Sequence, residues 1–179
     1  MSRKDEFYIW LAGVIDGDGC FAISLKKQHN SKIPALVVWC QVSISAKIED
    51  KWYLDYIQKE VGFGKVYLKK QGSPQGYAVA SYQTTNYQDS LELAKLVEPY
   101  LRLKKKKAEL FIKAIKYWNS TRGIVKGNIA RGERIRKASD VLNMVKIACE
   151  INSDRQTRRY KDKLSYEDWV PLIKEWYPE

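Results

Sequence analysis

The sequence contains little cysteine and only one histidine, and these shortages exclude several kinds of site. Cys20, Cys40 and Cys149 stand far apart without a C-x-x-C pair, which argues against a disulfide framework and against a zinc site. We interpret them as small buried hydrophobic residues in a reducing compartment. His29 is the single histidine, so a histidine-liganded metal centre and a histidine general base are excluded as the main catalytic group. Its polar neighbours predict a turn.

Long hydrophobic runs are also missing. No apolar stretch approaches the ~20 residues that a membrane-spanning helix needs, and the first residues lack the apolar core of a signal peptide. We therefore expect no membrane partner, no secretion, and a location in the cytoplasm or the interior of an organelle. The 179 residues are expected to form one domain over 1–179. Its core would span about 5–118, followed by a helical extension of about 119–179.

Positive charge is abundant and concentrated in one part of the chain. The formal net charge is +11, and residues 102–163 hold 19 Lys and Arg against 6 Asp and Glu. Such an excess indicates a polyanionic partner. We interpret one basic cluster of this block as a phosphate clamp that adds affinity and salt dependence: Arg155, Arg158, Arg159, Lys161 and Lys163. The alternative is a solvated charged tail.

The most informative motif is Leu11–Gly19, which reads LAGVIDGDG. Phe7–Ile15 is nearly all apolar, so this short helix needs cover on two sides, its own core on one and possible cover by a partner on the other. Gly13 and Gly17 stand on one face, where another helix would approach closely. Asp16 and Asp18 meet the negative end of the helix dipole, at a cost of roughly 0.3–1 kcal/mol each. Some interaction must therefore compensate for them.

The spacing of apolar and turn residues predicts an α+β protein with the order αββαββα and further helices. The predicted elements are a helix at about 5–17, strands at 20–28 and 35–46, a helix at 48–61, strands at 64–71 and 77–84, and helices at 87–98, 103–118, 134–151 and about 166–176. Four antiparallel strands would have one face covered by helices and a polar face left open. Val38, Cys40, Val42 and Ile44 are predicted to face inward, whereas the facing of the fourth strand is ambiguous.

These residues, in this order, resemble the LAGLIDADG homing endonucleases. The resemblance rests on Leu11–Gly19, on the αββαββα order, on the segment 61–67 (VGFGKVY) and on the segment 99–105 (PYLRLKK). It implies a single-motif homodimer whose two motif helices pack at a twofold axis above a DNA-binding saddle of two four-stranded antiparallel sheets. The resemblance also implies an intron-encoded, sequence-specific endonuclease, which makes a staggered double-strand break in a long, pseudo-palindromic site on double-stranded DNA.

The expected dimer interface lies on the motif helix. We assign Leu11, Gly13, Asp16 and Gly17 to it. Asp16 is about 200° around the helix from Asp18 and cannot share its site. Its expected role is structural, as a hydrogen-bond acceptor for a partner helix or as a cap.

Asp18 is the predicted metal ligand. Metal-dependent phosphodiester hydrolysis needs an activated water and a stabilised leaving oxygen, and Mg²⁺ prefers oxygen ligands. The Asp18 carboxylate and the Gly17 carbonyl are therefore assigned to Mg²⁺, with Mn²⁺ or Ca²⁺ as other occupants. Dimerisation would bring two Asp18 carboxylates together, and bridging metals would relieve their repulsion.

Two further positions follow from the resemblance. Lys104 matches a catalytic lysine near the scissile phosphate, and the alternative is one solvated cation in the run 104–107. Ala46 stands where many family members place a glutamine that holds water. Gln41 lies too far up the strand to replace it, and Lys47 or solvent remain as candidates.

The open sheet face is expected to read base edges in the major groove. Its predicted DNA-contacting residues are Ser24, Lys26, Gln28, Asn30, Trp39, Gln41, Ser43, Lys65, Tyr67, Lys69 and Gln71. A face that serves only solubility is the alternative, but Trp39 and Tyr67 would be poor choices for a bare surface.

Other functions are compatible with the same pattern. An intron RNA maturase or a non-cleaving DNA-binding regulator would keep the fold and the basic surface, whereas only a nuclease must keep Asp18. A basic α/β protein with coincidental glycines is the remaining alternative, and the agreement of several motifs argues against it.

Overall fold

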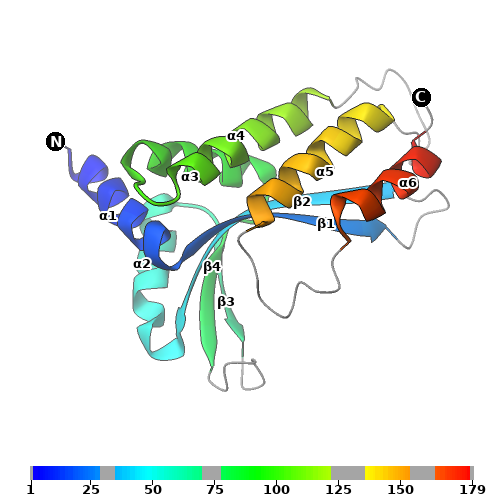
Figure 1. The fold of residues 1–179 in the computed structure, drawn as a ribbon. Coiled ribbons are helices and arrows are strands. Elements are labelled where there is room, and N and C mark those ends of the chain that lie inside the picture. Colours follow the sequence, from blue (N-terminus) through cyan, green and yellow to red (C-terminus); the bar gives the residue numbers. More distant parts are fainter. Residues whose placement is uncertain (1, 29–34, 70–77, 122–135, 154–163, 178–179) are drawn as a thin grey trace, which may run out of the picture. The chain divides into compact units, whose positions relative to one another are not determined.

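The computed structural model describes residues 2–28, 35–69, 78–121, 136–153 and 164–177 (Figure 1). The elements are α1 (Arg3–Asp18), β1 (Gly19–Gln28), β2 (Ala35–Lys47), η1 (Ile48–Asp50), α2 (Lys51–Val61), β3 (Lys65–Lys69), β4 (Val79–Gln83), α3 (Tyr87–Val97), η2 (Glu98–Tyr100), α4 (Lys105–Ser120), α5 (Ala138–Asn152) and α6 (Tyr166–Trp176). This order confirms the predicted αββαββα core with extra C-terminal helices. Within the described ranges, no helix is both long and apolar enough to cross a membrane.

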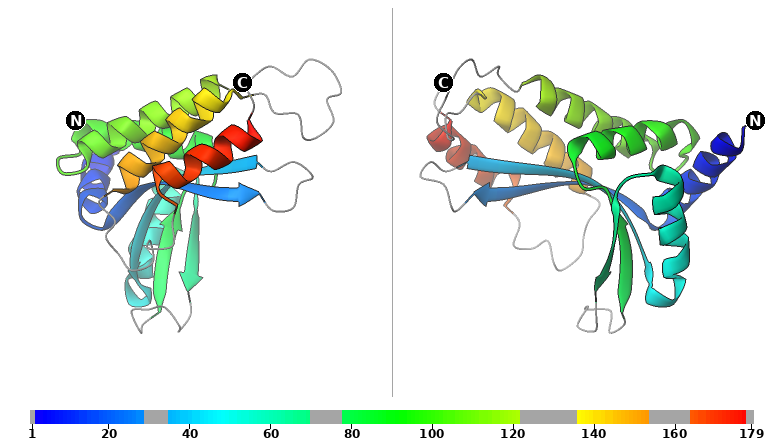
Figure 2. Two further views of the ribbon diagram at one scale, coloured as in Figure 1. Left: turned by 45° about the vertical axis from the view of Figure 1, so that its right-hand side comes forward. Right: turned by 180° about the vertical axis from the view of Figure 1, so that it is seen from behind.

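The contacts within the chain form two compact units, which share β1, β2 and α4. The first unit comprises residues 1–22 and 40–112, and the second comprises 23–39 and 113–179. In the first unit, α2 packs against β4 and β3, as Figures 1 and 2 show, and α1 packs against α3. In the second unit, α5 and α6 pack against each other. The expectation of one domain over 1–179 remains a prediction.

The four strands form one sheet in the order β1-β2-β4-β3. Both β2 and β3 pair antiparallel with β4, which places Ile44 and Val66 opposite Tyr82. Ile44 and Tyr82 are fully buried, and the predicted inward residues Val38, Cys40 and Val42 are buried as well. The pattern of β4 is ambiguous because Ala80, Ser81 and Tyr82 are all buried, so burial does not alternate along this strand.

The second unit is held by polar contacts as well as by apolar packing. The guanidinium of Arg136 lies 3.6 Å from the centre of the Trp118 ring and donates to the Trp118 carbonyl oxygen. The Tyr117 hydroxyl donates to the Asp140 carboxylate.

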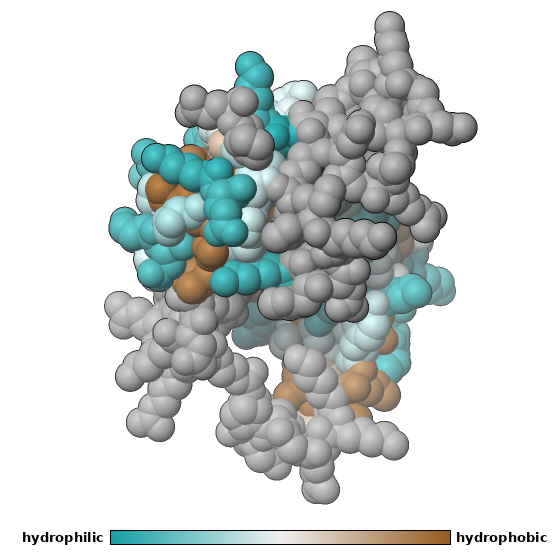
Figure 3. All heavy atoms as spheres, turned by 90° about the vertical axis from the view of Figure 1, so that its right-hand side faces the viewer, coloured by the Kyte–Doolittle hydropathy of each residue, from teal (hydrophilic) through white to brown (hydrophobic). Residues whose placement is uncertain are grey.

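On the face seen in Figure 3, the described hydrophobic residues form small areas among hydrophilic ones. The described part of this face is therefore suited to contact with water.

The turn between α2 and β3 depends on two glycines with left-handed backbone. Gly62 ends α2 at a φ of 84°, as the sequence predicts, and Gly64 follows at a φ of 80°. A Cβ on Gly62 would meet nothing within 4 Å, whereas a Cβ on Gly64 would lie 2.7 Å from the Tyr82 ring and hydroxyl. The two positions share the same backbone requirement, but only Gly64 also needs the space.

Alanine at these two positions should therefore have unequal effects. Gly62→Ala should lower the free energy of unfolding by about 1 kcal/mol, through backbone strain alone. Gly64→Ala should cost at least about 1 kcal/mol more, because the new methyl group overlaps Tyr82. Denaturant unfolding of both variants measures the difference. Equal losses would show that the Tyr82 ring moves aside without cost.

Candidate active site and nucleic-acid interface

A lysine from outside α1 neutralises the C-terminal end of this helix. The ammonium of Lys104 donates to the carbonyl oxygens of Ile15, Asp16 and Gly17, at 2.8, 2.8 and 3.1 Å. No basic residue lies in the last turn of α1 itself. A cation at this position stabilises the negative end of the helix dipole. Lys104 therefore compensates for the two acidic residues that end the motif.

Asp16 makes the reciprocal contact to the segment that carries Lys104. Its carboxylate accepts hydrogen bonds from the backbone N–H groups of Arg102, Leu103 and Lys104, at 2.7, 3.1 and 2.8 Å. Burial opposes ionisation of Asp16, but these three donors and the charge of Lys104 outweigh it, so the pKa lies below the usual 3.8. Asp16 thus has its hydrogen-bond partners within its own chain. A role for it in a dimer interface remains a prediction.

Asp18 is exposed next to this double contact. Within the described part of the chain, no hydrogen bond or ion pair holds its carboxylate. Its charge acts on two neighbours. Burial lowers the pKa of Lys104, and the negative charge of Asp18 is among the interactions that oppose this shift. Burial raises the pKa of Tyr53, and the charges of Asp18 and Asp50 raise it further.

The structure thus brings together the predicted residues Asp18, Gly17 and Lys104, and adds Tyr53 of α2. The sequence offers no signal for Tyr53, because its place near Asp18 depends on how α2 packs in the first unit. The tyrosine stays protonated at neutral pH, since every cause of its pKa shift acts upward.

The donors at the end of α1 are of the type that Mg²⁺ binds. The Asp18 carboxylate and the Gly17 carbonyl both offer hard oxygen atoms. They are too few for a complete site, and the described residues of one chain contain no group of three or more His, Cys, Asp or Glu that could hold a metal ion. The described residues therefore fit a magnesium site only if further oxygen donors complete it, for example from a second copy or a DNA phosphate.

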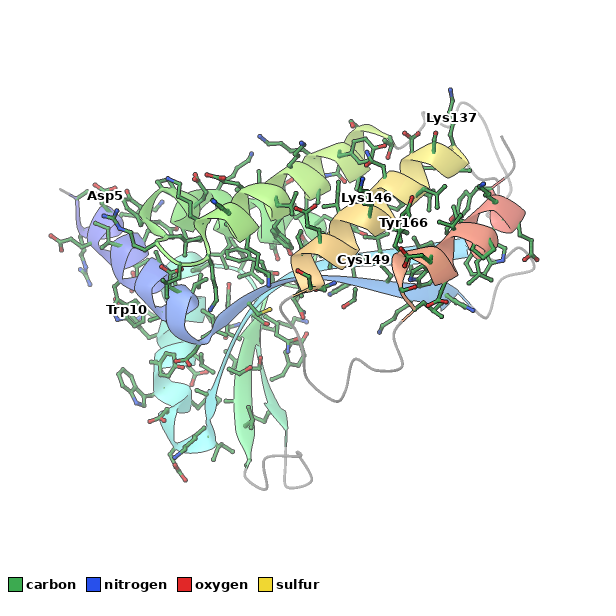
Figure 4. The ribbon with its side chains drawn as sticks, viewed as in Figure 1. Asp5, Trp10, Lys137, Lys146, Cys149 and Tyr166 are labelled. Carbon is green, nitrogen blue, oxygen red and sulfur yellow. The ribbon has the colours of Figure 1, made fainter. Side chains whose placement is uncertain are left out.

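The described residues leave one face of α1 uncovered. Gly13 and Gly17 are exposed, and a Cβ on either would meet nothing within 4 Å. Trp10, labelled in Figure 4, is 41% exposed on the same helix. Leu11, by contrast, is 0% exposed, so its predicted place in a dimer interface is wrong. Its side chain lies in the core of its own chain, because it occupies the opposite face of the helix.

Residues that pair across β2, β4 and β3 form rows on the open face of the sheet. Gln83 lies between Ser43 and Lys65, and Ser81 lies between Ser45 and Tyr67. Paired residues project to the same side of a sheet. β4 therefore contributes the middle residue of each row. The sequence does not predict these β4 residues, because burial does not alternate along this strand.

The predicted DNA-contacting residues fall partly on this sheet. The structure places Ser24, Lys26 and Gln28 on β1, Trp39, Gln41 and Ser43 on β2, and Lys65, Tyr67 and Lys69 on β3. Lys26, Trp39, Lys65 and Tyr67 are exposed, which agrees with their predicted outward facing. Residues outside the described ranges are His29, Asn30, Gln71, Arg155, Arg158, Arg159, Lys161 and Lys163. The Gln41 side-chain nitrogen donates hydrogen bonds to Gln83 and to the Thr84 carbonyl oxygen, and what replaces the glutamine expected at Ala46 stays a prediction.

Comparisons with known proteins agree with this geometry. A family model described as LAGLIDADG endonuclease matches residues 11–118. The DNA endonuclease I-CreI of Chlamydomonas reinhardtii is 28% identical over 110 residues, which cover 62% of this chain and 63% of that relative's length.

Solved structures show the same fold. The homing endonuclease I-CvuI, bound to its DNA target in the presence of calcium, aligns with a TM-score of 0.74 at 19% identity, over 96% of this chain and 94% of that chain. The archaeal intron-encoded homing endonuclease I-Vdi141I, complexed with DNA, aligns with a TM-score of 0.74 at 17% identity, over 97% and 98% of the two chains.

Neutralising Asp16 should destabilise the chain in a pH-dependent way. A carboxylate with a lowered pKa stabilises the folded state above its unfolded pKa, and this stabilisation is lost as the pH falls through the folded pKa. Asp16→Asn should therefore lower the free energy of unfolding by about 0.5–2 kcal/mol at neutral pH. The difference from the wild type should shrink as the pH falls below 3.8 and disappear once the pH is below the lowered pKa of Asp16 in the folded state. Denaturant unfolding across pH measures it, with the exposed Glu109→Gln as control. A pH-independent difference would contradict the charge-based account.

Proposed function

Because the family model covers residues 11–118, more than half of the chain, the chain belongs to the LAGLIDADG endonuclease family, and we propose that it is a sequence-specific DNA endonuclease. The observation that carries this proposal is the exposed Asp18 carboxylate at the end of α1, beside Gly17 and Lys104. The relatives named above are DNA endonucleases or were solved with DNA. This supports DNA cleavage over the alternatives of an RNA maturase or a non-cleaving regulator.

The proposed active form is a homodimer that associates through the uncovered face of α1. The exposed Gly13 and Gly17 support this, because they leave room for close approach of a second helix. Trp10 is exposed on α1, and Leu103 is 82% exposed in the segment that Asp16 holds beside the end of that helix. Large exposed apolar side chains are typical of an interaction surface. A twofold axis near Gly17 would bring two Asp18 carboxylates together.

The proposed cofactor is Mg²⁺, with Mn²⁺ or Ca²⁺ as other occupants. Asp18 and the Gly17 carbonyl from both chains would hold it, together with phosphate oxygens. When bound, the divalent cation supplies an activated water and stabilises the leaving oxygen. Lys104 fixes the orientation of the Gly17 carbonyl, to which it donates a hydrogen bond. On DNA binding it would exchange one carbonyl acceptor for a phosphate oxygen and stabilise the developing negative charge.

The proposed substrate is double-stranded DNA lying along the open sheet face, with strands in the major groove. Two chains related by a twofold axis would cut one strand each, which gives a staggered double-strand break in a pseudo-palindromic site. Such an enzyme would spread the intron that encodes it. The net charge of +11 supports binding to a polyanion.

Replacing the proposed metal ligand should abolish cleavage and leave binding intact. Asp18→Asn should lower the cleavage rate with Mg²⁺ by more than about a hundredfold, because a direct ligand is lost. The substrate is a randomised duplex library from which cleaved ends are captured and sequenced. Asp55→Asn, which changes an exposed carboxylate on α2, is the matched control. Cleavage that survives in Asp18→Asn would contradict the proposed site, and absence of cleavage by the wild type would contradict the proposed activity.

A larger side chain on the uncovered face of α1 should prevent dimerisation without preventing folding of the single chain. Gly13→Ala should raise the free energy of unfolding of the single chain by about 0.5–1 kcal/mol, because alanine is the better helix residue and nothing obstructs its methyl group. Gly13→Leu should fold equally well but sediment as a monomer, because the larger side chain keeps two helices apart. Analytical ultracentrifugation of both variants measures this. A dimer that persists in Gly13→Leu would place the interface elsewhere.

A further inference from the structure

A continuous chain of hydrogen bonds links four polar side chains on the open face of β2 and β4. The Gln41 side-chain nitrogen donates to the side-chain oxygen of Gln83 at 3.1 Å and to the Thr84 carbonyl oxygen at 3.2 Å. The Gln83 side-chain nitrogen donates to the Ser81 hydroxyl at 3.2 Å, and the Ser45 hydroxyl donates to the same oxygen. All these residues belong to the first unit.

The direction of this chain is fixed by one backbone group. The Thr84 carbonyl oxygen accepts hydrogen bonds and cannot donate them, so the Gln41 amide must turn its nitrogen toward it. The same nitrogen faces Gln83, which therefore must present its oxygen to Gln41. The Gln83 nitrogen is consequently turned toward Ser81. The orientations of both amides follow from the geometry and need no choice between oxygen and nitrogen.

Two polar groups of this hydrogen-bonded chain remain available to a ligand. Both hydrogens of the Gln41 nitrogen are used, whereas its side-chain oxygen makes no hydrogen bond within the described residues and is not a buried atom. The Gln83 nitrogen uses one hydrogen on Ser81 and keeps one. The pair therefore offers one acceptor, from Gln41, and one donor, from Gln83.

Only some base edges match this arrangement. In the major groove adenine presents the N7 acceptor and the N6 donor, whereas guanine presents two acceptors, N7 and O6. A guanine would leave the Gln41 oxygen facing another acceptor, and turning the Gln41 amide would break its bond to Thr84. A buried polar group without its partner is costly.

We propose that Gln41 and Gln83 act as one specificity-determining unit, which reads a single adenine in the DNA half-site. Gln41 accepts from N6 and Gln83 donates to N7. The inference rests on the proposed function, and it goes beyond the predicted open face in naming Gln83, the coupling between the two amides and the base that they select. Ser81 and Ser45 position the Gln83 amide without touching the base.

The test compares sequence preferences rather than activity. The wild type selects its preferred sites from a randomised DNA duplex library in the presence of Ca²⁺, and binding is then measured on duplexes with every single base-pair change. Gln83→Met and Gln41→Met should each lose about tenfold of the preference for adenine over guanine at one and the same position. The double variant should lose no more than either single variant, because both amides serve one contact. Gln88→Met on α3 is the matched control.

A second variant distinguishes base recognition by Gln83 from a purely structural role of this residue. Gln83→Glu keeps an acceptor for Gln41 and for the Ser81 hydroxyl, but it replaces the free donor by an acceptor. The preferred base at that position should change from adenine to one with a free donor, such as cytosine. A purely structural role predicts instead a uniform loss of binding to all sequences and a lower thermal midpoint.

The outcomes separate this inference from the proposed function. Three outcomes would overturn the inference alone. They are losses of base preference at two different positions that add up in the double variant, a uniform loss of binding to all sequences, and a wild-type preference for guanine at the affected position. A wild-type protein that enriches no sequence from the library would contradict the proposed function and the inference with it.

Discussion

The reciprocal contact between the end of α1 and the segment before α4 is the interaction on which the candidate site depends. Lys104 donates to three carbonyl oxygens of α1, and Asp16 accepts from three N–H groups of residues 102–104. Each segment offers polar groups that the other lacks, because a helix leaves its last carbonyls without partners and the N–H groups of residues 102–104 lie before the first turn of α4. The contact fixes the backbone of Gly17 and leaves the next residue, Asp18, free to bind a ligand.

This arrangement explains why acidic residues end an otherwise apolar helix. Asp16 is stabilised by the backbone before α4, and the charge of Lys104 offsets the helix dipole. Only Asp18 is left exposed with no hydrogen bond from the described residues, and this is what a metal ligand requires. One motif therefore contains a structural carboxylate and, two residues further on, the carboxylate proposed as the metal ligand.

Much of the fold follows from local sequence patterns. The order of helices and strands, the inward facing of β2 and the turn at Gly62 are readable because alternation, helical spacing and glycine act locally. The C-terminal cap by Lys104 cannot be predicted from local sequence, because it joins residues 87 or more positions apart. Gln83 was missed for a related reason: β4 is buried on both sides in its middle, so alternation fails, and only its pairing with β2 and β3 shows which residues share the open face. The sequence cannot place Leu11, because residues on every side of this helix are apolar. Only the packing of the folded chain shows which side of the helix is buried in its own core.

In the proposed active form, each chain supplies half of a metal site, and two chains complete it on DNA. The decisive measurement is a crystal structure of the complex with Ca²⁺ and a selected DNA duplex. We expect two copies related by a twofold axis, with α1 against α1, an Asp18 carboxylate from each copy on the bound calcium, and Asp16 still hydrogen-bonded to residues 102–104. A monomer on DNA, or calcium bound away from Asp18, would rule out this site.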